Sequence, residues 1–159
     1  MVEVQTEYEV ISENLASGSL KYPVLQFRGA SMFPARNDAE FITCSKTALK
    51  SGYFSGLLVV DSGGQARTVK TASKLRGVGA LWGYNLFLNQ KITVAVAFKP
   101  GEVQLDSRKL KDMVQNVLRG SQTWSSSSDN LQIAKAIEAA NTAVEIIEII
   151  VDAYYPEKI

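Results

Sequence analysis

DNLQIAKAIEAANTAVEIIEIIVDAY, residues 129–154, has the strongest periodic pattern in this chain. Its apolar residues recur at alternating steps of four and three, the spacing that places side chains on one face of an α-helix. At ~1.5 Å per residue, the pattern predicts one uninterrupted helix about 40 Å long. The apolar stripe consists of Ile133, Ile137, Ala140, Val144, Ile147, Val151 and Tyr154.

Two roles are open to a helix of this length. It lies on a sheet as a core helix, or it packs one stripe internally and offers another to a second copy or a partner protein. The strands of a typical sheet span only ~20 Å, so part of the helix would project beyond them. A long exposed apolar stripe is an association surface. The residues that would carry this association are Ile133, Ile137, Val144, Ile147, Val151 and Tyr154.

The preceding part of the chain is typical of strands followed by one further helix. Asp61-Ser-Gly-Gly has the chemistry of a hairpin turn, and it separates two strand-like runs. Ser45 begins a short helical turn, and Asp106 or Ser107 begins a longer helix that ends at Gly120. The predicted strands lie within 1–12 and at 24–28, 41–44, 57–60, 65–72 and 92–98.

These elements together predict an α+β fold. We expect a single domain over 1–159, with an antiparallel, barrel-like curved sheet over about residues 1–100. Two helices follow in 101–159, joined by a polar connection at 121–128, and the last helix is the long one. A length of 159 residues suits one domain of this kind.

Composition excludes several classes of site. The chain has no histidine, which excludes histidine-based triads and histidine metal ligands. Cys44 is its single cysteine, so no intrachain disulfide forms, and we expect a buried thiol there. We expect no metal and no cofactor. The acidic start does not resemble a secretory signal, and no apolar run approaches the ~20 residues that span a membrane. A cytoplasmic protein without membrane contact is therefore expected.

The net charge of +1 conceals a strong segregation of charge. Residues 21–119 carry a net charge of +9, and each flanking segment carries −4. One interpretation is an anion-binding site, and the other is that the acidic ends fold back over the basic middle. Nucleic acid is not the expected partner, because no RNA-binding or zinc-finger signature accompanies these bases. The candidate anion-binding residues are Arg67, Lys70, Lys74 and Arg76, with Lys46 and Lys50 upstream.

One motif suggests catalysis. Residues 29–34 read Gly-Ala-Ser-Met-Phe-Pro, and Lys70 follows on a predicted strand. A lysine that is desolvated against apolar neighbours loses its proton near neutral pH and activates a hydroxyl without histidine. Over about residues 28–72 the chain resembles the serine–lysine peptidases of the LexA and signal-peptidase type. The resemblance implies that Ser31 is the nucleophile and Lys70 the general base, with Met32 and the Ser31 backbone N–H framing the oxyanion.

Two functions from different classes follow. The first is a non-enzymatic binding, regulatory or immunity-like protein that acts through protein–protein association, as a homodimer or with a partner, through the 129–154 helix. The alternative is a Ser–Lys hydrolase that uses Ser31 and Lys70. The absence of other recognisable catalytic patterns favours the first function.

Overall fold

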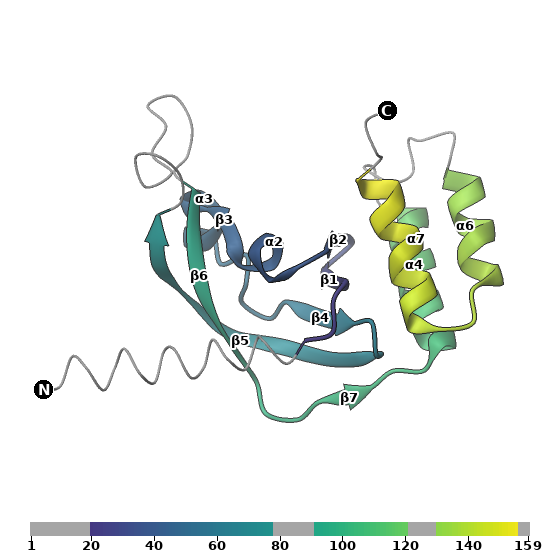
Figure 1. Cartoon of the computed structure of the whole chain (residues 1–159), viewed down its shortest axis with the longest axis horizontal. Coiled ribbons are helices and arrows are strands. Elements are labelled where there is room, and N and C mark those ends of the chain that lie inside the picture. The colour runs from purple at the N-terminus through teal and green to yellow at the C-terminus, as the bar shows by residue number, and fades with distance from the viewer. Residues whose placement is uncertain (1–19, 78–90, 121–129, 156–159) are drawn as a thin grey trace, which may run out of the picture. The chain divides into compact units, whose positions relative to one another are not determined.

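The computed structural model describes residues 20–77, 91–120 and 130–155 (Figure 1). These residues form two compact units. Unit 1 comprises 37–57, 68–77 and 91–100 together with Leu20, and unit 2 comprises 21–36, 58–67, 101–120 and 130–155. Unit 2 therefore combines strands from the first hundred residues with the C-terminal helices, across the division predicted at residue 100. The strand predicted within 1–12 and the connection at 121–128 lie outside the described residues.

Unit 2 contains an antiparallel sheet. Strand β1 (Val24–Arg28) pairs with β2 (Ser31–Ala35) on one side and with β4 (Leu58–Asp61) on the other. The first residues of β5 (Gln65–Gly77) follow β4 in the strand order and also pair with β7 (Val103–Gln104). The predicted strand at 24–28 and the predicted hairpin around Asp61-Ser-Gly-Gly are confirmed. β2 was not predicted, because residues 29–34 match the Gly-x-Ser-Met-x-Pro motif and do not alternate clearly between apolar and polar residues.

The turn between β4 and β5 is held by the buried side chain of Asp61. Its Oδ1 accepts hydrogen bonds from the backbone N–H groups of Gly63 and Gln65, both at 3.0 Å, and its Oδ2 accepts one from the Lys21 N–H at 3.3 Å. Asp61 is only 1% exposed, so these donors replace the water that a buried carboxylate loses. Residue Gly64 follows in the left-handed region at φ +80. This chemistry explains why Asp and Gly occupy these positions.

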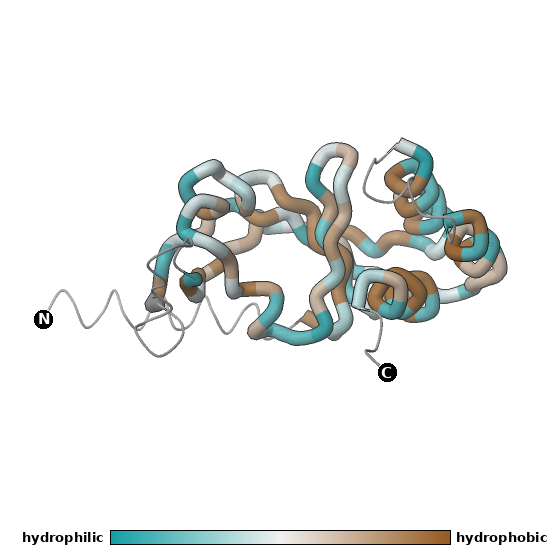
Figure 2. Tube along the Cα trace, turned by 90° about the horizontal axis from the view of Figure 1, so that it is seen from above, coloured by the Kyte–Doolittle hydropathy of each residue, from teal (hydrophilic) through white to brown (hydrophobic). Residues whose placement is uncertain are grey.

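Three helices of unit 2 follow the sheet in the described residues: α4 (Ser107–Gly120), α6 (Asn130–Ala139) and α7 (Ala143–Tyr154). The Asp106 carboxylate caps α4 by accepting a hydrogen bond of 2.7 Å from the Lys109 N–H, as the sequence predicts. Helices α4 and α7 contact β2, and α6 contacts both of these helices. Figure 2 shows apolar and polar residues alternating along all three helices. Their apolar sides meet the sheet in one core, formed by Leu25, Phe27, Met32, Val60, Ala66, Leu105, Leu110, Val114, Val117, Leu118, Ile137, Ala140, Ile146, Ile147 and Ile150.

The prediction of one long helix over 129–154 is wrong. The chain leaves the helical conformation at Ala140, and α7 begins after Thr142. The Thr142 hydroxyl accepts from the Glu145 N–H at 3.3 Å, while a Glu145 carboxylate oxygen accepts from the N–H groups of Asn141 and Thr142. This is a capping box, which the Thr-x-x-Glu spacing indicates. The apolar period continues through the break because both helices bury their apolar sides in the same core.

Unit 1 contains α2 (Asp38–Ile42), β3 (Thr43–Ser45), α3 (Lys46–Lys50), the second part of β5, and β6 (Lys91–Phe98). β6 pairs antiparallel with both β5 and β3. Residues Phe41 and Ile42, predicted to be in a strand, instead end α2, whereas the helical turn after Ser45 and the strand at 92–98 are confirmed.

The core of unit 1 is aromatic and lies beside a curved pair of strands. The Phe41 ring lies 6.4 Å, centroid to centroid, from the rings of Phe54 and Phe98. The register between β5 and β6 shifts twice, and Figure 1 shows both strands curving along their length. Such irregularities bend a strand pair. The predicted α+β class with an antiparallel, curved sheet is therefore confirmed.

Candidate functional site

The proposed catalytic pair lies on two different strands. Ser31 is the first residue of β2 and pairs with Arg28 across the β1–β2 hairpin. Lys70 lies on the part of β5 that belongs to unit 1, and β1 and β4 stand between β2 and β5 in the strand order. Lys70 is exposed to solvent. Its surroundings in unit 1 therefore do not supply the desolvation that a general-base lysine requires.

The four candidate anion-binding residues are divided between the two units. Arg67 belongs to unit 2, where its Nη2 lies 2.9 Å from the Glu102 Oε1 and its side chain is only 11% exposed. Lys70 and Lys74 are exposed on the unit 1 part of β5, and the backbone of Arg76 lies further along the same strand. The Arg67 guanidinium already has a carboxylate partner, so only the other three residues remain as candidates.

The residues predicted to associate lie partly in the core. Ile137 and Ile147 are fully buried, and Ile133 and Val151 are partly buried against the same core. Tyr154 is 40% exposed, and Val144 is half-buried. The centre of the predicted stripe therefore holds unit 2 together, and an association surface has to be sought on the outer sides of the helices.

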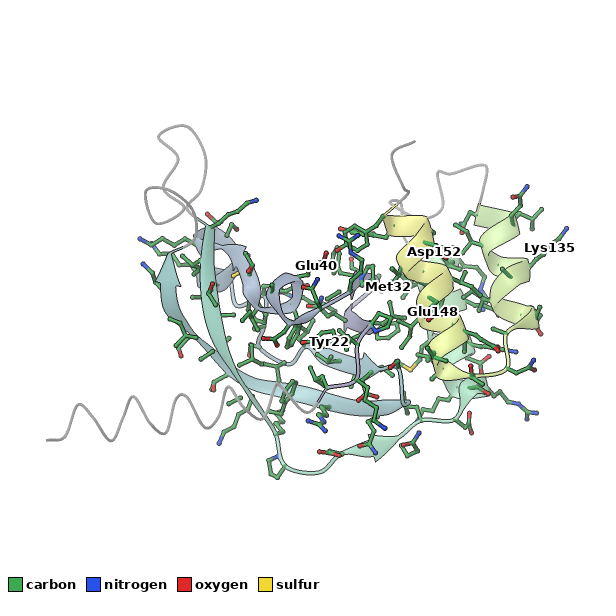
Figure 3. All side chains as sticks on the ribbon, in the orientation of Figure 1. Tyr22, Met32, Glu40, Lys135, Glu148 and Asp152 are labelled. Atoms are coloured by element: carbon green, nitrogen blue, oxygen red, sulfur yellow. The ribbon has the colours of Figure 1, made fainter. Side chains whose placement is uncertain are left out.

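The outer sides of α4, α6 and α7, here called the helical face, carry opposite charges on different helices. α4 has a net charge of +3, with Arg108, Lys109 and Arg119 exposed, whereas α7 has a net charge of −3. Figure 3 shows Glu148 and Asp152 on one side of α7 and Lys135 projecting from α6 away from the other two helices. The charge sums from the sequence place α4 in the basic middle and α7 in the acidic end, but they do not show that these two helices pack against each other in one unit.

A groove of about 450 Å³ lies between α4 and α6. Leu131 lies in it with 67% of its surface exposed, which is unusual for a leucine. Among the described residues, the buried Oδ1 of Asn130 accepts no hydrogen bond. The residues that line this α4–α6 groove are Gln115, Leu118, Arg119, Asn130, Leu131 and Ala134. An occupant with an apolar group and a hydrogen-bond donor would satisfy both features.

Polar contacts hold the two walls of this groove together. The Lys111 Nζ donates a hydrogen bond of 2.8 Å to the Glu138 carbonyl oxygen, and the Gln115 Nε2 donates one of 2.9 Å to the Glu138 Oε2. A second pocket of about 470 Å³ lies on the other side of α4, against the β1–β2 turn. α4 is therefore flanked by a concave surface on each side.

Cys44 lies in β3 and is half-buried. Burial raises the pKa of the Cys44 thiol above its ordinary value of 9.0. Because the thiolate is the nucleophile, we expect iodoacetamide to alkylate Cys44 roughly tenfold more slowly than glutathione at about pH 8. The rate should still be rising with pH at 9.0, where the rate of a thiol with the ordinary pKa levels off, and mass spectrometry measures it. Alkylation as fast as that of glutathione would contradict the protection by burial.

Two further properties concern the described residues alone. Nowhere in 20–77, 91–120 and 130–155 do three acidic or cysteine side chains gather in a way that would hold a metal ion. No helix in these ranges combines the length and apolar character needed to cross a membrane.

Comparison of the chain with protein-family models, curated proteins and solved structures finds no match. The resemblance to serine–lysine peptidases therefore rests on the motif residues alone.

Proposed function

We propose that this is a non-enzymatic binding protein that acts through protein–protein association, and that its helical face pairs with the helical face of a second copy. The observation that carries the proposal is the opposite net charge of two helices of unit 2 that pack against each other, +3 on α4 against −3 on α7. The serine–lysine hydrolase is not proposed, because Lys70 is exposed.

A two-fold symmetric dimer uses these charges twice. In such a dimer, the α4 of each copy meets the α7 of the other, so every favourable contact is repeated by symmetry. Complementary charges accelerate association and disfavour other orientations, in which like charges would meet. A face of uniform charge would instead repel its own copy.

The α4–α6 groove adds an apolar component. Leu131 and Leu118 provide apolar surface in the groove, and Arg119 provides a positive charge. α7 presents the matching combination, with the half-buried Val144 and Val151 near the exposed Glu148. Complete burial of an exposed leucine contributes about 2 kcal/mol, so filling the groove stabilises the dimer beyond the charge contacts.

Charge exchange between two variants tests the proposal. The acid-reversed variant carries Glu148→Lys with Asp152→Lys, and the base-reversed variant carries Arg108→Glu with Arg119→Glu. We expect the native chain to form a dimer in sedimentation equilibrium. Each variant alone should dimerise at least about tenfold more weakly, because like charges then face each other. An equimolar mixture should regain the native affinity as a heterodimer.

Two controls accompany the mixture. Exposed lysines of unit 1 are reversed by Lys70→Glu with Lys99→Glu, which should leave dimerisation unchanged. Leu131→Asp should weaken dimerisation without lowering the free energy of unfolding of the monomer. A strict monomer at high concentration, or a mixture of the reversed variants that stays monomeric, would refute the proposal. A loss of monomer stability in Leu131→Asp would show instead that residues of the same chain fill the groove.

A further inference from the structure

Three helix ends of unit 2 lie together. α4 ends at Gly120 and α6 begins at Asn130, whose Nδ2 donates a hydrogen bond of 3.1 Å to the Leu118 carbonyl oxygen near the end of α4. The short connection 140–142 then turns the chain back, so α7 runs toward the end at which α6 begins, as Figure 1 shows. Tyr154, the last residue of α7, therefore lies at the end of the helices that carries the α4–α6 groove.

The α4–α6 groove requires two properties of an occupant. Leu131 exposes 67% of its surface in it, and this surface calls for an apolar group. The Oδ1 atom of Asn130 is buried and accepts no hydrogen bond from any described residue, and this atom calls for a donor. Among the described residues that line the groove, none comes from α7, so the chain's own Tyr154 does not meet these requirements.

One exposed side chain of α7 has both properties. The others that α7 exposes are the carboxylates of Glu145, Glu148 and Asp152, which accept hydrogen bonds and do not donate them. Tyr154 is 40% exposed and combines an apolar ring with a hydroxyl donor. Its ring is supported edge-on by the ring of Tyr155, with the two centroids 4.8 Å apart.

The charge of the groove also suits the end of α7. The C-terminal end of an α-helix carries about half a negative elementary charge, and the last turn of α7 contains no basic residue. Arg119 lines the groove and is exposed. Its Nη2 donates a hydrogen bond of 3.1 Å to the Asn116 Oδ1, and a guanidinium has further N–H groups for the carbonyl oxygens of a second helix.

We propose that Tyr154 of each copy inserts into the α4–α6 groove of the other copy, with its ring against Leu131 and its hydroxyl donating to the Asn130 Oδ1. This inference rests on the dimer proposed above and names the side chain that fills its groove. Because Tyr154 and the groove lie at the same end of the helices, one two-fold axis at that end serves both contacts. Tyr154 then determines which ends of the two helical faces meet.

Sedimentation equilibrium of the full chain tests this inference. Tyr154→Phe removes only the hydroxyl. A net hydrogen bond contributes about fivefold in affinity, and symmetry repeats the contact, so the dissociation constant of the dimer should rise about 25-fold. Tyr154→Ala also removes the buried ring and should raise the dissociation constant by about 100-fold or more.

Tyr155→Phe is the matched control. The Tyr155 hydroxyl donates a hydrogen bond of 3.2 Å to the Pro34 carbonyl oxygen of its own chain. Loss of a bond that lies within one chain should change the dissociation constant of the dimer by less than about twofold.

A double-mutant cycle tests the acceptor atom. Tyr154→Phe is measured in the native chain and in Asn130→Leu, so that any effect of Asn130→Leu on the single chain cancels. Because Asn130→Leu leaves no acceptor for the Tyr154 hydroxyl, Tyr154→Phe should no longer weaken dimerisation in that background.

Mixing two defective variants tests whether the contact forms between copies. Tyr154→Ala keeps an intact groove, and Leu131→Asp keeps Tyr154. Each variant alone lacks both contacts, whereas a heterodimer restores one of them. An equimolar mixture should therefore dimerise about tenfold more strongly than either variant alone.

Three results would overturn this inference and leave the proposed dimer intact. They are native affinity in Tyr154→Phe, an equal loss of affinity in Tyr155→Phe, and a mixture of Tyr154→Ala with Leu131→Asp that dimerises no better than its components. In each case the two charge-reversed variants would still restore one another. If the charge-reversed mixture stays monomeric, the proposed function is refuted and the Tyr154 contact with it.

Discussion

Gly64→Ala is expected to lower the free energy of unfolding of unit 2 by about 3 kcal/mol. Gly64 has φ +80, a conformation that costs an L-residue about 1–2 kcal/mol. An added Cβ would also lie 2.7 Å from the Gln104 Nε2 and 3.0 Å from the Leu105 backbone oxygen. Overpacking of this kind adds about 1–3 kcal/mol.

The surroundings of Gly64 cannot easily move away. The Leu105 N–H donates a hydrogen bond of 2.9 Å to the Gly64 carbonyl oxygen, and the Gln104 Nε2 donates one of 2.9 Å to the Gly63 carbonyl oxygen. A shift that relieves the contact therefore strains the bonds that join the turn to the segment after β7. The clash involves backbone as well as a flexible side chain, so relaxation recovers only part of the loss.

Gly29→Ala is the matched control for this prediction. Gly29 also belongs to unit 2 and has φ +56, but an added Cβ would meet nothing within 4 Å. Gly29→Ala should therefore lower the free energy of unfolding by only about 1 kcal/mol, from the left-handed conformation alone. Urea denaturation followed by circular dichroism measures both variants. Equal losses in the two variants would show that the turn has room for a side chain at Gly64.

Ile147→Ala is expected to lower the free energy of unfolding by about 3 kcal/mol. Ile147 is 0% exposed and belongs to the core that α4, α6 and α7 share with the sheet. Its truncation removes buried methyl groups and leaves a cavity among close-packed neighbours. Val144→Ala changes a half-buried residue of the same stripe and should cost about 1 kcal/mol or less.

Denaturation at two protein concentrations separates the two roles considered for the 129–154 stripe. Truncation of a core residue lowers the free energy of unfolding equally at both protein concentrations. Truncation of a residue that acts only in association would lower the affinity of the dimer and leave the free energy of unfolding of the monomer unchanged. If Ile147→Ala weakened dimerisation alone, the assignment of Ile147 to the core would be wrong.

Both proposals depend on tertiary information. The helical face combines charges of α4 and α7, which are separated in the sequence by the whole of α6. The proposed Tyr154 contact depends on the α4–α6 groove, whose walls meet at the hydrogen bond between Asn130 and Leu118. Regional sums of charge contain neither arrangement. The candidate anion-binding residues were grouped because they are close together along one strand: Arg67, Lys70, Lys74 and Arg76. The structure instead pairs Arg67 with Glu102.

Short-range chemistry was sufficient for the elements that the sequence predicted correctly. The Asp61-Ser-Gly-Gly turn, the alternation at 92–98 and the Asp106 cap each depend on side chains within a few residues of one another. The capping box at Thr142 also depends on neighbouring residues and could have been predicted from the Thr-x-x-Glu spacing. It was overlooked because the apolar period continues through it. A helix that breaks and resumes in the same core keeps its period, so periodicity alone does not distinguish one helix from two.

The amino-acid sequence by itself determined the α+β class, the hairpin, α4 and the apolar character of the C-terminal region. Only the tertiary structure decided that this region forms two helices, that Ile137 and Ile147 face a core, and that α4 packs against α7, a helix of opposite net charge. The physical reason is the separation along the chain of the residues that interact. Turns, caps and periods arise from neighbours in the chain, whereas burial and charge complementarity arise from residues that only packing and strand register bring together.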